Sequence, residues 1–256
     1  MNVLAIANHK GGVGKSAISL NLAALLAQLH DKRVLLIDID PQSSLTESVV
    51  GSAENANLSH VLGDSKAGTL GLGDIIQTVS ERLDIAPSDI QLADNELGLV
   101  LRRGRESILA NALAPLVNRY DITIIDCPPS LNVLTVNALN MADAVLVPTQ
   151  PSATDLRGTR LFLQSVESIR AELNPHLEIL GVIPTFADTR YLHHRDAIED
   201  LTAAGVNVWP TVGRTVKIQE AMIDGEPLHT YAPTNRQVAK FKQIAAKVNS
   251  WLNESE

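Results

Sequence analysis

Short runs of apolar residues alternate along the chain with longer segments in which apolar positions recur every three or four residues. Val, Ile and Leu dominate the short runs, most of which are nearly continuous. Such runs are typical of strands that are buried on both faces of a parallel sheet. We therefore predict strands at Val3–Ala7, Val34–Asp38, Leu83–Ala86, Ile122–Asp126, Ala144–Thr149, Ile179–Pro184 and Val206–Trp209.

The longer segments between the runs predict amphipathic helices. The first predicted helix has the apolar face Ile18, Leu22, Leu25, Leu26 and Leu29. A second, which starts near Thr154, has the apolar face Leu161, Val166 and Ile169. The last, at about 233–252, has the apolar face Val238, Phe241, Ala245, Val248 and Leu252. Repeated strand–helix units predict an α/β fold with one doubly wound, mostly parallel sheet and helices on both faces. Because no linker or repeat interrupts the pattern, we expect a single domain over residues 1–256.

Composition narrows the functional classes. The 256 residues carry a formal net charge of −8, which excludes a generally basic nucleic-acid binder and restricts any DNA contact to a local patch. A single cysteine cannot form a disulfide, a zinc cage or an iron–sulfur site within one chain. No apolar stretch reaches the roughly 18 residues of a membrane span, and no signal peptide is recognisable, so we expect a cytoplasmic protein.

The strongest chemical motif is the sequence His-Lys-Gly-Gly-Val-Gly-Lys-Ser at residues 9–16, between the first strand and the first helix. Glycines let the backbone approach phosphate oxygens closely, and the helix N-terminus offers free N–H groups to an anion. In such a loop Lys15 would contact the β- and γ-phosphates, and the hydroxyl of Ser16 would bind Mg²⁺. The predicted phosphate-binding residues are Lys10, Gly11, Gly12, Val13, Gly14, Lys15, Ser16 and Ala17.

Three carboxylates lie at or just after the ends of predicted strands. Asp38 and Asp126 end two strands, and Asp40 follows two residues after Asp38. Ligands of doubly wound sheets bind at the carboxyl ends of the strands, so these groups should lie near the phosphate loop. We predict that Asp38 and Asp126 serve Mg²⁺, Asp126 through a water molecule, and that Asp40 positions the water that attacks the phosphate.

Together these motifs resemble the ParA branch of the ParA/MinD family of P-loop ATPases with a deviant Walker A sequence. The resemblance rests on residues 10–16, 38–42, 126–130, 147–151, 214–221 and 225–227, and it extends from residue 2 to about 247. It implies a face-to-face dimer that encloses two ATP molecules, in which Lys10 reaches the partner's phosphates and acts in catalysis with Lys15 and Asp40. Because the chain starts directly with the first strand, no N-terminal helix-turn-helix domain is expected.

The resemblance also implies a cellular role. ParA proteins bind DNA non-specifically as ATP dimers, and a ParB-type adaptor stimulates their weak ATP hydrolysis and releases them from the nucleoid. The cycle partitions or positions plasmids, chromosomes or other cargo. Among the basic residues of the C-terminal half we favour Arg190, Arg214 and Lys217 as DNA contacts, because Arg214 and Lys217 match basic positions of the family.

The main alternative is a MinD-like positioning ATPase that binds a membrane through its last helix, where Lys240, Lys242 and Lys247 flank an apolar stripe. The acidic residues at 253–256 and the Pro-Pro-Ser sequence at 128–130 disfavour it. A nitrogenase-reductase-like protein would need paired thiolates at its dimer interface, which one cysteine per chain does not supply. A bacterial tyrosine kinase is disfavoured because none of the three tyrosines clusters at the C-terminus.

Overall fold

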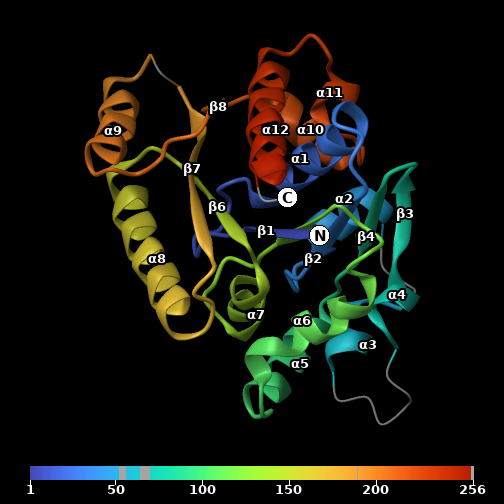
Figure 1. The fold of residues 1–256 in the computed structure, drawn as a ribbon. Coiled ribbons are helices and arrows are strands. Elements are labelled where there is room, and N and C mark those ends of the chain that lie inside the picture. Colours follow the sequence, from blue (N-terminus) through green and yellow to red (C-terminus); the bar gives the residue numbers. More distant parts are fainter. Residues whose placement is uncertain (52–55, 64–69, 189, 255–256) are drawn as a thin grey trace.

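A computed structural model describes residues 1–51, 56–63, 70–188 and 190–254, except for the side chain of Ala153. Within these residues one eight-stranded sheet has the order β3-β4-β2-β5-β1-β6-β7-β8, and only the β3–β4 pair is antiparallel (Figure 1). The fold is thus the predicted mostly parallel P-loop type. The strands are β1 (Asn2–Ile6), β2 (Val34–Asp38), β3 (Gln77–Ser80), β4 (Leu83–Ala86), β5 (Ile122–Asp126), β6 (Ala144–Thr149), β7 (Glu178–Ala187) and β8 (Val212–Gly213).

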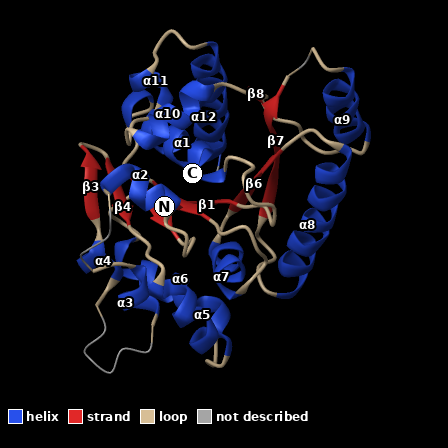
Figure 2. Ribbon diagram, turned by 180° about the vertical axis from the view of Figure 1, so that it is seen from behind, coloured by secondary structure: helices blue, strands red, loops and turns tan. Residues whose placement is uncertain are grey.

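Helices cover both faces of this sheet (Figure 2). The α-helices are α1 (Lys15–Leu29), α2 (Ser44–Val50), α3 (Leu58–Leu62), α4 (Leu72–Ile75), α5 (Gln91–Val100), α6 (Ile108–Leu113), α7 (Val133–Met141), α8 (Ala153–Glu172), α9 (Leu192–Ala203), α10 (Val216–Ile223), α11 (Leu228–Tyr231) and α12 (Arg236–Glu254), with short 3₁₀ turns η1 (Arg105–Ser107) and η2 (Ala114–Leu116). Alternate residues of β1 serve two cores: Val3 and Ala5 face one, and Leu4 and Ile6 face the other. A strand buried on both faces must be apolar throughout, which explains the continuous runs.

One strand prediction needs correction, and one strand was missed. Val206–Trp209 makes only an isolated bridge between Val208 and Val182, and the eighth strand is β8, which follows Pro210. Proline cannot donate to a strand ladder, so regular pairing stops before it. The edge strand β3 was not predicted, because its Gln-Thr-Val-Ser sequence lacks an apolar run.

The predicted helix faces are mostly correct. All five predicted residues of α12 are buried, and α12 packs against α1, so its apolar stripe is already covered. Leu29 and Leu161, however, are 52% and 58% exposed. Around the axis of α8, Leu161 is rotated by about 80° or more from Ile169 and Val166, so it does not share their face. Phe162 is buried in its place. None of the described helices is both long and apolar enough to cross a bilayer.

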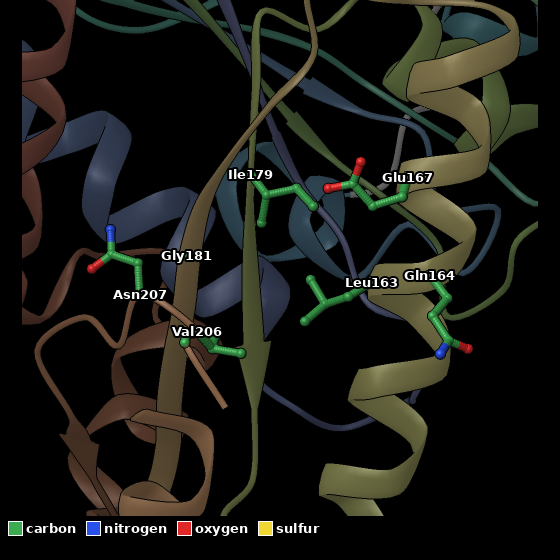
Figure 3. A pocket seen from close by; sticks show the side chains of 8 residues that line it. Leu163, Gln164, Glu167, Ile179, Gly181, Val206 and Asn207 are labelled. Carbon is green, nitrogen blue, oxygen red and sulfur yellow. The ribbon is translucent and has the colours of Figure 1, made fainter. Parts of the chain in front are cut away.

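Gly181 of β7 occupies a position that no larger residue fits. It lines a hollow of about 490 Å³ between α8 and β7, which is bounded by Leu163, Gln164, Glu167, Ile179, Gly205, Val206 and Asn207 (Figure 3). Its φ is +147°, and a Cβ atom there would lie 2.2 Å from the backbone oxygen of Asn207 and 2.6 Å from the ring of Trp209. We expect Gly181→Ala to lower the free energy of unfolding by roughly 3 kcal/mol, measured by urea denaturation.

Gly98 of α5 provides the matched control for this substitution. It has an ordinary φ, and a Cβ atom there would meet nothing within 4 Å. Because alanine favours a helix over glycine, Gly98→Ala should leave stability unchanged or raise it by up to about 1 kcal/mol. Equal denaturation midpoints for the two variants would contradict the steric argument.

Candidate active site

The loop of residues 7–14 joins β1 to α1 at the carboxyl end of the sheet, between the ends of β5 and β6. Gly12 and Gly14 have φ values of +71° and +87°, which favour glycine. Gly14 caps α1, and its carbonyl oxygen accepts a hydrogen bond from the N–H of Ile18 at 2.9 Å. The first N–H groups of α1 therefore stay available to an anion in the loop.

Side chains from neighbouring strand ends hold this loop in place. The side-chain amide of Gln150 donates to the carbonyl oxygen of Gly12 at 3.1 Å. The hydroxyl of Thr185 donates to the carbonyl oxygen of Val13 at 2.8 Å. The Asn8 amide donates to the carbonyl oxygen of Pro148 at 2.7 Å. These hydrogen bonds fix the loop in the absence of a ligand, so a ligand would bind with little further cost in loop entropy.

Lys15 directs a buried ammonium group into the loop. Only 7% of the residue is exposed, and its Nζ atom lies 3.3 Å from the carbonyl oxygen of Lys10. Burial lowers the pKa of Lys15, and the nearby charge of Asp126 partly opposes this. A phosphate in the loop would supply the opposite charge that this ammonium needs.

Asp38 and Asp126 are adjacent across the β2–β5 pair, where the strand register matches one to the other. Both are buried, and burial raises the pKa of each; the charge of Asp126 raises that of Asp38 further. The Ser19 hydroxyl donates to Asp126 at 2.9 Å, and the nearby Ser16 hydroxyl also lowers the pKa of Asp126, against the effect of burial. Two neighbouring buried carboxyl groups favour a site where a cation can bind.

The donor set of Ser16 and Asp126 fits Mg²⁺, which prefers oxygen ligands and usually retains several waters. In the part of the chain that the structure describes, no three His, Cys, Asp or Glu side chains form a complete metal cage. The remaining ligands would therefore have to come from water or phosphate. A direct role for Asp38 stays a prediction.

Asp38 holds the segment that follows it. One carboxylate oxygen accepts the N–H of Asp40 at 3.0 Å, and the other accepts the N–H and the hydroxyl of Thr46 at 2.9 and 2.8 Å. Asp40 is half-buried on this segment, and its own carboxylate accepts the N–H of Gln42 at 2.9 Å. Asp38 thus fixes the backbone from which the Asp40 side chain projects.

The second loop lysine has an intramolecular partner that the sequence motifs did not indicate. The Lys10 ammonium forms an ion pair with Asp155 in the first turn of α8. The side chain of Lys10 is 43% exposed, whereas that of Asp155 is only 4% exposed. In this structure Lys10 is therefore held against its own chain.

Phe186 is another residue that sequence reasoning missed. Its φ of +52° is unusual for an aromatic residue, and its ring lies 3.4 Å from where a Cβ atom on Gly14 would be. It lines a hollow of about 280 Å³ next to the phosphate loop, together with Gly12, Gln150, Arg214, Thr215, Val216 and Gln219. Backbone strain of this kind often marks a ligand site. One isolated phenylalanine gives no sequence pattern that could reveal it.

The three predicted DNA contacts differ in their surroundings. Arg190 pairs with Asp188 at 2.6 Å, and Lys217 pairs with Glu220 at 2.6 Å. Arg214 is exposed and forms no ion pair within the described residues. All three assignments remain predictions, and Arg214 has the charge most available to a phosphate.

Comparison with known proteins extends these findings. A family model described as an AAA domain matches residues 1–179. The sporulation initiation inhibitor protein Soj of Bacillus subtilis is 39% identical over 96% of this chain and 97% of its own length. The chromosome partitioning protein ParA of Caulobacter vibrioides is 38% identical over 90% of this chain and 87% of its own length. The structure of Mycobacterium smegmatis cobyrinic acid a,c-diamide synthase with a bound ATP analogue and magnesium matches with a TM-score of 0.86 and 32% identity, covering 100% of this chain and 97% of that one.

Proposed function

Because this chain belongs to the ParA/MinD family of ATPases, in its ParA branch, we propose that it is a positioning ATPase that binds and hydrolyses ATP with Mg²⁺. The observation that carries the proposal is the phosphate loop: it is fixed by its own chain, and the buried Lys15 ammonium points into it. Such a loop favours a polyphosphate ligand, since backbone N–H groups and an ammonium converge on one anionic site.

Each site residue has a definite role in this proposal. Lys15 binds the β- and γ-phosphates, and Ser16 with Asp126 holds Mg²⁺, which would neutralise charge on the phosphates. Asp40 orients the attacking water from the segment that Asp38 fixes. Phe186 supports the loop, because its ring lies against Gly14 at the start of α1.

In the proposed cycle two ATP-bound copies meet face to face, and Lys10 of each copy reaches the phosphates of the other. A cation supplied across an interface stabilises the transition state of phosphoryl transfer and makes hydrolysis depend on dimerisation. The partly exposed Lys10 side chain at the loop surface supports this role. A ParB-type adaptor would stimulate the weak hydrolysis of the dimer.

The ATP dimer would bind DNA non-specifically and associate with the nucleoid, where it positions a plasmid, a chromosome region or another cargo. Arg214 supports this proposal because it lines the same hollow as Gly12 of the phosphate loop. The proposed nucleotide site and the basic surface at Arg214 are thus adjacent. Dimerisation would double the number of basic groups, and affinity for DNA rises with the number of phosphates neutralised.

Sedimentation with DNA or with anionic vesicles tests this function. We expect ATP-dependent co-sedimentation with DNA and none with vesicles, because the apolar stripe of α12 is buried against α1. Arg214→Glu should weaken DNA binding about 10-fold at roughly 0.1 M salt, since a phosphate contact is replaced by repulsion. It should leave ATP affinity unchanged.

Arg103→Glu is the charge-matched control, because it makes the same charge change beyond α5 on the opposite side of the sheet. This variant should bind DNA as the native protein does. Vesicle binding without DNA binding would favour the membrane alternative. Equal DNA binding by both arginine variants would remove Arg214 from the proposed surface.

A further inference from the structure

The ion pair between Lys10 and Asp155 joins the phosphate loop to a helix 145 residues further along the chain. Asp155 is buried in the first turn of α8, where its N–H donates to the hydroxyl of the helix cap Ser152 at 3.2 Å. Its backbone oxygen accepts the hydroxyl of Thr159 at 2.9 Å. The backbone that carries the Asp155 carboxylate is therefore held by two hydrogen bonds from side chains of the same segment.

The residue before Lys10 is docked on the same helix. The imidazole of His9 lies 3.0 Å from where a Cβ atom on Gly158 would be, and its ring centroid is 6.0 Å from that of Phe162. Gly158 thus gives His9 room against α8. The consecutive residues His9 and Lys10 thus both contact the N-terminal turns of α8.

An ammonium paired with Asp155 already has its charge largely neutralised, so it is less available to a phosphate of a facing protomer. We propose that Asp155 is a positioning residue that retains Lys10 on its own chain until the phosphates of the partner's ATP compete for it. This inference rests on the proposed function, in which Lys10 acts across the dimer. The ion pair would then oppose closure of the dimer and keep the protein monomeric while nucleotide is absent.

After release of Lys10, the position of Asp155 on α8 would still stabilise its negative charge. A carboxylate in the first turn of a helix is stabilised by the positive end of the helix dipole. The Asp155 side chain is only 4% exposed, whereas that of Lys10 is 43% exposed, so only the ammonium side of the pair faces solvent. Opening the pair therefore leaves a buried carboxylate without its cation, which is costly, and the phosphates of the partner's ATP must offset this cost to release Lys10.

The test compares the native protein with Asp155→Asn by analytical ultracentrifugation with ATP and Mg²⁺ over a range of protein concentrations. The variant should dimerise with a dissociation constant about 3- to 10-fold lower, because Lys10 no longer has to leave a carboxylate. ATP affinity at protein concentrations below dimerisation should not change. Asp155→Glu, which keeps the negative charge, should dimerise as the native protein does.

Two further variants separate this effect from a structural one. In a Lys10→Ala background, Asp155→Asn should no longer strengthen the dimer, since the competing group is gone. Asp196→Asn removes an exposed carboxylate from α9 and should have no effect on the dimer. Urea denaturation of the unliganded variants will show whether each is folded.

The outcomes distinguish this inference from the function on which it rests. If the native protein forms no ATP-dependent dimer, the proposed function itself fails. If the native dimer forms but Asp155→Asn leaves its dissociation constant unchanged or raises it, the retaining role of Asp155 is wrong. The same conclusion holds if Asp155→Asn strengthens the dimer equally with and without Lys10. Should Asp155→Asn not fold, Asp155→Ser takes its place under the same criteria.

Discussion

Replacing Lys15 with alanine should abolish measurable ATP binding, with a loss of affinity of at least about 100-fold in isothermal titration. The ammonium is buried and directed into the phosphate loop, and its 3.3 Å contact to the carbonyl oxygen of Lys10 is a weak one. Charge-assisted hydrogen bonds to phosphate contribute about 1.5–3 kcal/mol each, and two of them account for a loss of this size.

The same substitution should not destabilise the unliganded protein. Burial lowers the pKa of Lys15, which means that the folded chain disfavours its charged form relative to water. Removing the group should therefore leave the free energy of unfolding unchanged or raise it, so loss of ATP binding could not be ascribed to unfolding. Lys32→Ala, in the segment that follows the C-terminal end of α1, is the control and should bind ATP normally. Native affinity in Lys15→Ala would refute the assigned phosphate site.

The placement of the loop between β1 and α1 could be predicted from sequence because its motif lies in consecutive residues, whereas its binding of phosphate stays a prediction. The same holds for the carboxylates at strand ends, since parallel strands end at one edge of the sheet. The register that pairs Asp38 with Asp126 confirms that they are neighbours. Here local sequence and sheet geometry were sufficient, because no contact between distant side chains had to be known.

Contacts between distant segments could not be predicted in this way. An acidic residue such as Asp155 is common in the first turn of a helix, here one that is capped by Ser152. Because this position already accounts for the residue, the sequence gives no sign of its ion pair with Lys10. Thr46 and Phe186 belong to no motif, and their roles depend on where the chain returns to the site. Packing, not periodicity, sets such positions.

The surface charges illustrate a different limit. Asp188 and Arg190, like Lys217 and Glu220, are close enough in sequence to pair locally, and both pairs form. The spacing of Lys217 and Glu220 on a helix is one that favours an ion pair. Sequence spacing thus already contained a reason to rank Arg214 above the other two candidates. Which of them meets DNA depends on the shape of the dimer, which a single chain does not determine.

Asp40→Ala should bind ATP with native affinity but hydrolyse it at least about 100-fold more slowly, because the attacking water loses the carboxylate that orients it. The structure explains why binding should survive. Asp38 accepts its hydrogen bond from the backbone N–H of Asp40, which alanine retains, so the segment stays attached to the site. The ATP-bound dimer should therefore accumulate and remain on DNA. Phosphate release and DNA co-sedimentation measure the two effects.

Asp89 offers a control for the one hydrogen bond that Asp40→Ala does remove. Asp40 accepts the N–H of Gln42 at 2.9 Å, and Asp89 accepts that of Gln91 at 3.1 Å in the same two-residue spacing. Asp89→Ala removes a hydrogen bond of the same kind outside the proposed site, and we expect this variant to turn over ATP normally. A native rate in Asp40→Ala would mean that another group orients the water. A loss of ATP binding would mean that the carboxylate supports the segment itself, a role that the backbone contact to Asp38 argues against.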